Sequence, residues 1–161
     1  MSGKLVELEA FATLPRHARL MGLDIGAKTI GLSLSDVERV IASPLDTIIR
    51  AKFTKDAQEL VALIMRHGVG GLVLGLPRNM DGSEGRAAQS ARSFARNLAP
   101  LVELPFAFWD ERLSTAAVTR TLIEADRSRA RRNLLVDKLA ATYILQGALD
   151  RLNRLSGKTP S

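Results

Sequence analysis

The sequence contains no cysteine, which excludes disulfide bonds and thiolate metal sites and suits a reducing compartment. With only two histidines, a bound metal would depend on oxygen ligands, which suit Mg²⁺ or Mn²⁺. Aromatic residues make up 4% of the chain, which argues against a platform for stacking single-stranded bases. There is neither an apolar run of about eighteen residues nor an N-terminal apolar region of the kind found in secretory signals. We therefore expect no membrane span and a cytoplasmic location.

The composition that remains is that of one basic globular domain. The chain has 161 residues, about the length of a single domain, and 46% of them are hydrophobic, enough for a substantial core. The net charge is +6, and most of the basic residues are arginines. Such a charge favours a nucleic-acid partner, with a merely soluble or ribosome-associated basic domain as the alternative.

The hydrophobic pattern changes period along the chain. Residues 1–17 lack clear periodicity and are interpreted as an N-terminal extension, residues 18–155 as the domain, and residues 156–161 as a polar tail. Strands are predicted at residues 19–25, 29–36, 40–49, 71–76 and 104–109. Four helices are predicted. The first has Ala57, Leu60, Val61 and Ile64 on its inward face, and the second begins near Glu84 and has Ala87, Ala91, Phe94 and Leu98 inward. The third spans residues 114–125, and the fourth runs from about Leu134 to Leu152. Residues 126–133 are predicted as a charged loop, and Pro44 places its strand at a sheet edge or a bulge.

This order predicts an α/β fold with a mixed five-stranded sheet. The first three strands form an antiparallel meander, and the later strands alternate with helices as in βα units. The wholly apolar strand at 71–76 is typical of a central parallel strand covered on both sides. Helices are therefore expected on both faces of the sheet.

Asp137 is an acid on the apolar stripe of the last predicted helix. Its neighbours at helical spacing are Leu134, Ala140, Ala141 and Ile144. Burying an unpaired carboxylate is costly, so Asp137 needs a partner. A buried basic side chain such as Arg112 is one explanation, and a metal ion is another.

Two further acidic positions lie at strand ends. Asp24 shares a strand face with Gly22, which leaves room for a close approach, although Asp24 could instead start the turn that follows. Asp110 and Glu111 end the strand at 104–109, where α/β proteins gather their sites, or else serve as helix-entry residues. In an extended strand end these two side chains point to opposite faces, so only one is expected to reach a shared site.

Convergence of Asp24, Glu111 and Asp137 would create a site for one or two divalent cations. Such ions take carboxylate ligands while keeping some waters and accepting phosphate oxygens. Two of them together can activate a water and stabilise the leaving oxygen of a phosphodiester. The three acids therefore predict a metal-dependent nuclease site.

Basic residues accompany the acids. The loop at 75–85 has glycines that permit tight turns but lacks the P-loop pattern, and its Arg78 suits a phosphate backbone. Arg92 and Arg96, one turn apart on the following helix, would also suit a phosphate backbone, but a solvated helix face is the favoured interpretation. Four arginines crowd together shortly before Asp137: Arg127, Arg129, Arg131 and Arg132. They are interpreted either as a solvated loop or as the substrate-binding loop of a nuclease. The predicted nucleic-acid-binding set also includes Lys28 and Arg112.

Four sequence blocks, taken together, resemble the YqgF/RuvX family. They are GLDIGAKTIGLSLSD, VLGLPRNMDGSEG, DERLST and VDKLAA, in the family's order within residues 18–150. The departures are the N-terminal extension and Ser114 of DERLST, where the family usually has threonine. The resemblance implies an RNase H-like fold and a hydrolase, namely a metal-dependent phosphodiesterase. It implies catalytic and metal-ligating roles for Asp24, Glu111 and Asp137, with Asp110 as the alternative to Glu111.

The family is associated with maturation of the 5′ end of pre-16S rRNA, which implies a pre-ribosomal particle as a partner of a monomer or homodimer. A Holliday-junction resolvase acting on branched DNA is the alternative enzyme, since both substrates offer phosphates to the same metals. A non-catalytic module that binds the rRNA precursor is the alternative without chemistry. An actin-like ATPase fragment, suggested by DIGAKTIGLSLSD, is disfavoured because such enzymes place their nucleotide between two domains.

Overall fold

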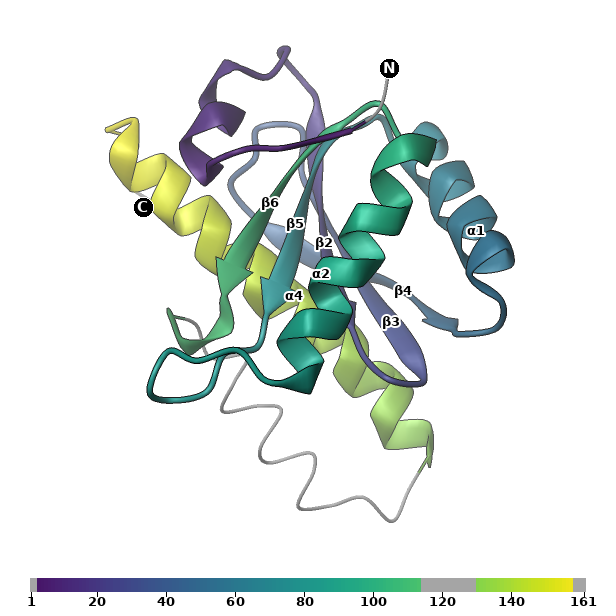
Figure 1. Cartoon of the computed structure of the whole chain (residues 1–161). Coiled ribbons are helices and arrows are strands. Elements are labelled where there is room, and N and C mark those ends of the chain that lie inside the picture. The colour runs from purple at the N-terminus through teal and green to yellow at the C-terminus, as the bar shows by residue number, and fades with distance from the viewer. Residues whose placement is uncertain (1–2, 114–129, 158–161) are drawn as a thin grey trace.

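The protein is built on a six-stranded sheet. The computed structural model describes residues 3–113 and 130–157, and its strands lie in the order β1-β6-β5-β2-β3-β4 (Figure 1). They are β1 (Lys4–Leu5), β2 (Arg19–Ile25), β3 (Thr29–Ser35), β4 (Ala42–Ile49), β5 (Val69–Leu76) and β6 (Pro105–Asp110). β2, β3 and β4 form an antiparallel meander, while β1, β6, β5 and β2 run parallel. The predicted mixed α/β sheet is confirmed, but the predicted count of five strands is one too low.

The additional strand comes from the N-terminal segment. Lys4 and Leu5 pair with the start of β6, and the 3-10 helix η1 (Leu8–Thr13) then buries Leu8 and Phe11. A two-residue strand has no periodicity of its own, so the sequence pattern alone could not reveal it. Part of the segment interpreted as an extension therefore packs on the domain and covers the outer edge of β6.

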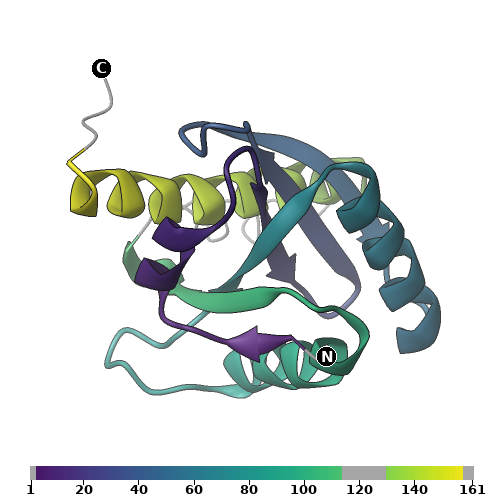
Figure 2. The ribbon, with the colours of Figure 1, turned by 90° about the horizontal axis from the view of Figure 1, so that it is seen from above.

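Helices cover both faces of the sheet, as predicted (Figure 2). α1 (Phe53–Arg66) and α2 (Arg86–Leu98), followed by the 3-10 helix η2 (Ala99–Leu101), lie on one face, and α4 (Ala130–Leu155) lies on the other. The prediction of a loop at 130–133 is wrong because α4 already includes these residues, and alanine and arginine are strong helix formers. The helix predicted at 114–125 lies outside the described residues. Within residues 3–113 and 130–157, no helix is long and apolar enough to cross a membrane.

Each face of the sheet has its own apolar core. Alternation along β2 sends Leu23 toward α1 and α2 and Leu20 toward α4. On α2 the inward stripe includes Ala88, whereas Ala87, which was predicted inward, is exposed because the buried face starts one residue later. The prediction for Pro44 is confirmed, since β4 is an edge strand whose pairing with β3 shifts register beside Pro44.

Candidate active site

Three parallel strands end at one edge of the sheet and bring the predicted acids there. Asp24 lies near the end of β2, Gly75 near the end of β5, and Glu111 directly after β6. Leu23 pairs with Leu74 in the parallel ladder, which sets Asp24 beside Gly75. Adjacent strands are about 4.8 Å apart, so segments distant in the sequence become neighbours. The carboxyl ends of parallel strands are also where α/β proteins build their sites.

Asp24 points to the face of the sheet that α4 covers. It is buried, and alternation along β2 puts it on the same side as Gly22. A Cβ at Gly22 would lie 2.8 Å from Leu145 Cβ and 2.9 Å from the carbonyl oxygen of Ala141. The prediction that glycine on this face permits a close approach is confirmed, and the element that approaches is α4.

Glu111 reaches the same face from the end of β6. It begins the 3-10 helix η3 (Glu111–Leu113) and is 2% exposed. Its carboxyl carbon and Oε2 lie 3.2 Å from the point that a Cβ would take at Gly75, and Ile144 of α4 also borders that point. Gly75 lies where the predicted strand at 71–76 and the predicted loop at 75–85 overlap, and the structure places it inside β5, next to the Glu111 carboxylate. Any larger side chain at Gly75 would compete for this space.

Asp110 lies on the other side of the strand end and pairs with Arg112. The Arg112 guanidinium donates from Nε to both carboxylate oxygens (3.0 and 3.1 Å) and from Nη2 to Oδ2 (2.6 Å). This hydrogen-bonded fork holds the pKa of Asp110 below its ordinary value and raises the pKa of Arg112. The placement supports Glu111 rather than Asp110 as the acid that accompanies Asp24, and that choice stays a prediction.

The third predicted acid, Asp137, belongs to α4, but its side chain lies outside the described part of the chain, as do those of Arg131 and Arg132. Position 137 is about one helical turn before Ala141, the residue that crosses Gly22. A meeting of all three acids therefore stays a prediction. Among residues whose side chains are described, no group of three or more His, Asp or Glu is arranged to hold a metal ion. Arg127 and Arg129 also lie outside the described residues.

Three predicted cations follow the ends of these three parallel strands. Lys28 lies in the turn after β2, Arg78 follows β5, and Arg112 follows β6. Lys28 and Arg112 are exposed, and Arg78 is half-buried. A polyanion lying along this edge of the sheet would meet acids and cations together.

Arg92 departs from its prediction as a solvated residue. It donates to both oxygens of Glu84 at 2.6 and 2.7 Å, and its guanidinium lies 4.9 Å from the centroid of the Phe108 ring. Hydrogen bonding by Arg92 holds the pKa of Glu84 below its ordinary value. Glu84 also lies 3.4 Å from Arg78, so it links the loop after β5 to α2. Arg96, in contrast, is exposed as predicted.

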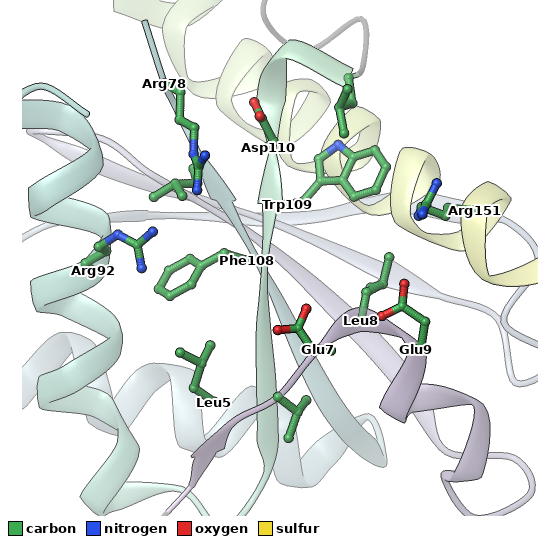
Figure 3. Close-up of a pocket in the computed structure, with 13 residues that line it drawn as sticks. Leu5, Glu7, Leu8, Glu9, Arg78, Arg92, Phe108, Trp109, Asp110 and Arg151 are labelled. Carbon is green, nitrogen blue, oxygen red and sulfur yellow. The ribbon is translucent and has the colours of Figure 1, made fainter. Parts of the chain in front are cut away.

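A separate hollow of about 480 Å³ runs along the outer edge of β6 (Figure 3). Phe108 and Trp109 project to opposite sides of β6 there, with Arg92 on the side of Phe108 and Arg151 on the side of Trp109. Neither Asp24 nor Glu111 lines it. Its charged lining consists of Glu7, Glu9, Arg78, Arg92, Asp110 and Arg151. Because the lining contains as many acids as arginines, this hollow has no charge preference for an anionic ligand.

Known proteins resemble the chain over most of its length. Residues 18–151 match the family model of RuvX, described as Holliday junction resolvase. The chain is 64% identical over 146 residues to a candidate pre-16S rRNA nuclease of Paramagnetospirillum magneticum, covering 91% of this chain and 94% of the relative. It is 61% identical over 141 residues to a protein of the same name from Methylocella silvestris, covering 88% and 87%.

Solved structures resemble the fold at much lower sequence identity. The yeast mitochondrial Holliday junction resolvase Ydc2 aligns with a TM-score of 0.54 and 13% identity, over 92% of this chain and 85% of that one. Thermus thermophilus RuvC aligns with a TM-score of 0.51 and 12% identity, over 87% and 97%. Identities this low speak for the fold alone, and the predicted RNase H-like class is confirmed.

Proposed function

The chain belongs to the RuvX family, and on that premise we propose that it is a metal-dependent nuclease acting in 5′-end maturation of pre-16S rRNA. The names of the relatives support the rRNA substrate, and the family description keeps branched DNA as the second candidate. The observation that carries the proposal is the pair of buried carboxylates, Asp24 and Glu111, on one face at the strand ends. We place the reaction in the cytoplasm, on a pre-ribosomal particle.

The carboxylates fit a divalent cation as their common partner. Carboxylate oxygens are the donors that Mg²⁺ and Mn²⁺ take from proteins, and Gly75, which has no side chain, lets the Glu111 carboxylate lie close to the backbone of β5. We propose Asp24, Glu111 and Asp137 as the ligands. When bound, the ion would lower the pKa of a water molecule and stabilise negative charge on the leaving oxygen.

The remaining task of the site is to hold the substrate. Lys28 follows the end of β2, which carries Asp24, and Arg78 follows the neighbouring end of β5, so both side chains would contact backbone phosphates next to the carboxylates. Gly75 of β5 and Ile144 of α4 both border the place where the Glu111 carboxylate lies, so the carboxylate is enclosed between the sheet and α4. The net charge of +6 attracts a polyanion before any specific contact forms.

A cleavage assay with two substrates tests the proposal. A 5′-extended 16S rRNA precursor and a four-way DNA junction are each incubated with Mg²⁺ or Mn²⁺ and with wild type, Asp24→Asn or Glu111→Gln. Asp46→Asn, which changes an exposed acid on the edge strand β4, is the matched control. We expect wild type and the control to cut the RNA and the two site variants to leave it intact.

The other outcomes separate the alternatives. Cleavage of the junction with intact RNA would move the assignment to branched DNA. If neither substrate is cut and all four proteins bind the RNA tightly, the chain is a non-catalytic module that binds the rRNA precursor.

A further inference from the structure

The end of β6 carries three consecutive charged residues in two different environments. Glu111 is 2% exposed and faces α4. The side chains of Asp110 and Arg112, in contrast, are 18% and 30% exposed and contact each other on the other side of the strand end. One carboxylate of the pair Asp110–Glu111 is therefore directed into the site and the other away from it.

Asp110 and Arg112 close the turn between β6 and η3. Besides the fork from the guanidinium, the backbone N–H of Arg112 donates to Asp110 Oδ1 at 3.0 Å. Among the described residues, Arg112 donates all four of the hydrogen bonds that the two oxygens of Asp110 accept. Charge-assisted forks of this kind are strong and fix the relative orientation of their partners.

Arg112 also reaches the neighbouring loop. Its Nη1 donates to the Met80 carbonyl at 3.4 Å and lies 3.6 Å from the point that a Cβ would take at Gly82. This loop has its own closure, since Asn79 N–H donates to the Ser83 carbonyl at 2.9 Å. One guanidinium therefore joins the end of β6, which leads into Glu111, to the loop that follows β5, the strand whose Gly75 lies beside the Glu111 carboxylate.

We propose that Asp110 is a positioning residue that acts through Arg112 to hold Glu111 over Gly75, and that it is not a metal ligand. To coordinate a cation, Asp110 would have to release hydrogen bonds that occupy both of its oxygens. The Arg112 guanidinium, for its part, binds Asp110 and does not contact a substrate phosphate. The inference rests on the proposed nuclease function for its catalytic consequence, whereas the coupling between Asp110 and Arg112 does not depend on that function.

The test compares the full-length variants Asp110→Asn, Arg112→Lys, their combination and Glu111→Gln. Asp81→Asn is the matched control, because the charge of Asp81 acts on Arg112 while its carboxylate accepts hydrogen bonds only from Ser83 of its own turn. Mn²⁺ binding is followed by electron paramagnetic resonance of the free ion. Cleavage of the rRNA precursor supplies kcat and KM, and denaturant unfolding of the metal-free proteins supplies the folding equilibrium constants.

We expect Asp110→Asn to keep wild-type Mn²⁺ affinity and to lower kcat about 10-fold at unchanged KM, as for the loss of a partner that orients a ligand. Arg112→Lys should behave alike, since lysine keeps the charge but loses the fork. The combination should be no worse than either change alone, because both remove one contact. Asp81→Asn should match wild type, and Glu111→Gln should weaken Mn²⁺ binding by about 10-fold or more.

Three results would overturn the proposal. A loss of Mn²⁺ affinity in Asp110→Asn equal to that in Glu111→Gln would make Asp110 a ligand. A higher KM at unchanged kcat in Arg112→Lys would assign Arg112 to substrate phosphate. Additive effects of the two substitutions on unfolding would show that the fork does not couple them. If wild type neither binds Mn²⁺ nor cleaves, the proposed function fails, and the unfolding measurements alone still decide whether Asp110 acts through Arg112.

Discussion

The two faces of the sheet are both covered by helices, but the strands present different side chains to them. Toward α1 and α2 they present large apolar residues, including Met21, Leu23 and Leu74. Toward α4, at the level of the acids, the strands present Gly22 and Gly75. The helix lies so close there that a Cβ added at either glycine would clash with it. Both faces have an apolar core, but at the level of the acids the α4 face carries glycines, so the backbone of the helix can approach the sheet.

This difference shows how a small sheet accommodates buried acids. Polar groups on the α4 face are bonded to backbone: Ser33 Oγ donates to the Ala141 carbonyl at 2.7 Å, and Gln146 accepts from the Ala42 N–H and donates to the Val40 carbonyl. Satisfied polar groups cost little in the interior. Burial of apolar area on the α1–α2 face supplies much of the stability, which leaves the α4 face free to carry carboxylates.

The largest effect on activity is expected from the α4 face. Asp137→Ala should reduce metal-dependent cleavage at least about 100-fold, more than loss of a residue that merely orients a ligand. Without metal, the variant should be as stable as wild type or more so, because an acid leaves a crowded anionic site. Cleavage rates and denaturant midpoints measured on the same preparation check both parts. A stable variant that cleaves at the wild-type rate would remove Asp137 from the site.

The largest effect on stability is expected from the opposite face. Leu74 is fully buried under α1 and α2, and Leu74→Ala should lower the free energy of unfolding by about 2–5 kcal/mol. Below the unfolding transition, kcat should match wild type. The measurement is denaturant unfolding followed by circular dichroism, with cleavage assayed at low temperature. A selective loss of kcat in a fully folded variant would mean that the two faces do not divide their tasks as described.

A smaller loss of stability is expected where α4 approaches the sheet. Gly22→Ala introduces a Cβ 2.9 Å from the Ala141 carbonyl oxygen, which is backbone and cannot rotate away. Overpacking of this kind costs about 1–3 kcal/mol and should displace α4, so cleavage should fall as well. Gly85→Ala is the control, because the nearest atom to its Cβ would be 3.7 Å away. Equal unfolding midpoints for the two variants would contradict the close approach.

The smallest effect is expected at the turn between β3 and β4. Partial burial raises the pKa of Asp36, but N–H groups of Ile41 and Val40, which donate at 3.0 and 2.7 Å, outweigh it and hold the pKa below 3.8. A carboxyl with a lower pKa in the folded state adds stability above its unfolded pKa and loses it as the pH falls through the folded value. Asp36→Asn should therefore be less stable than wild type at pH 7.

Unfolding midpoints of wild type and Asp36→Asn, taken from pH 7 to pH 2, test this expectation. The difference should shrink below about pH 4, where the carboxyl of the unfolded chain becomes protonated. A difference that stays constant over the whole range would assign the effect to turn geometry instead of charge.

Sequence reasoning located features that break or repeat a local pattern. Asp24 and Asp137 stand out against apolar neighbours, and the long alternating and helical segments identify the meander, α1 and α2. It missed β1, because two residues form no pattern and the strand with which they pair, β6, begins only at Pro105. It placed Gly75 in both the predicted strand and the predicted loop, because glycine at the end of an apolar run suits a turn as well as a strand. It predicted a solvated side chain for Arg92, because Glu84 and Phe108 become neighbours of Arg92 only after folding.

The contacts of α4 also bear on how the protein is made. Ser33 bonds to Ala141, Arg39 to Asn153 and Ala42 to Gln146, over separations of 108, 114 and 104 residues. A nascent chain on the ribosome must therefore wait for its last helix before one face of its sheet is covered, and such non-local closure is slow. A translation product interrupted before α4 would lack both that cover and Asp137. Under the proposed function, we therefore expect such a fragment to be inactive as a nuclease.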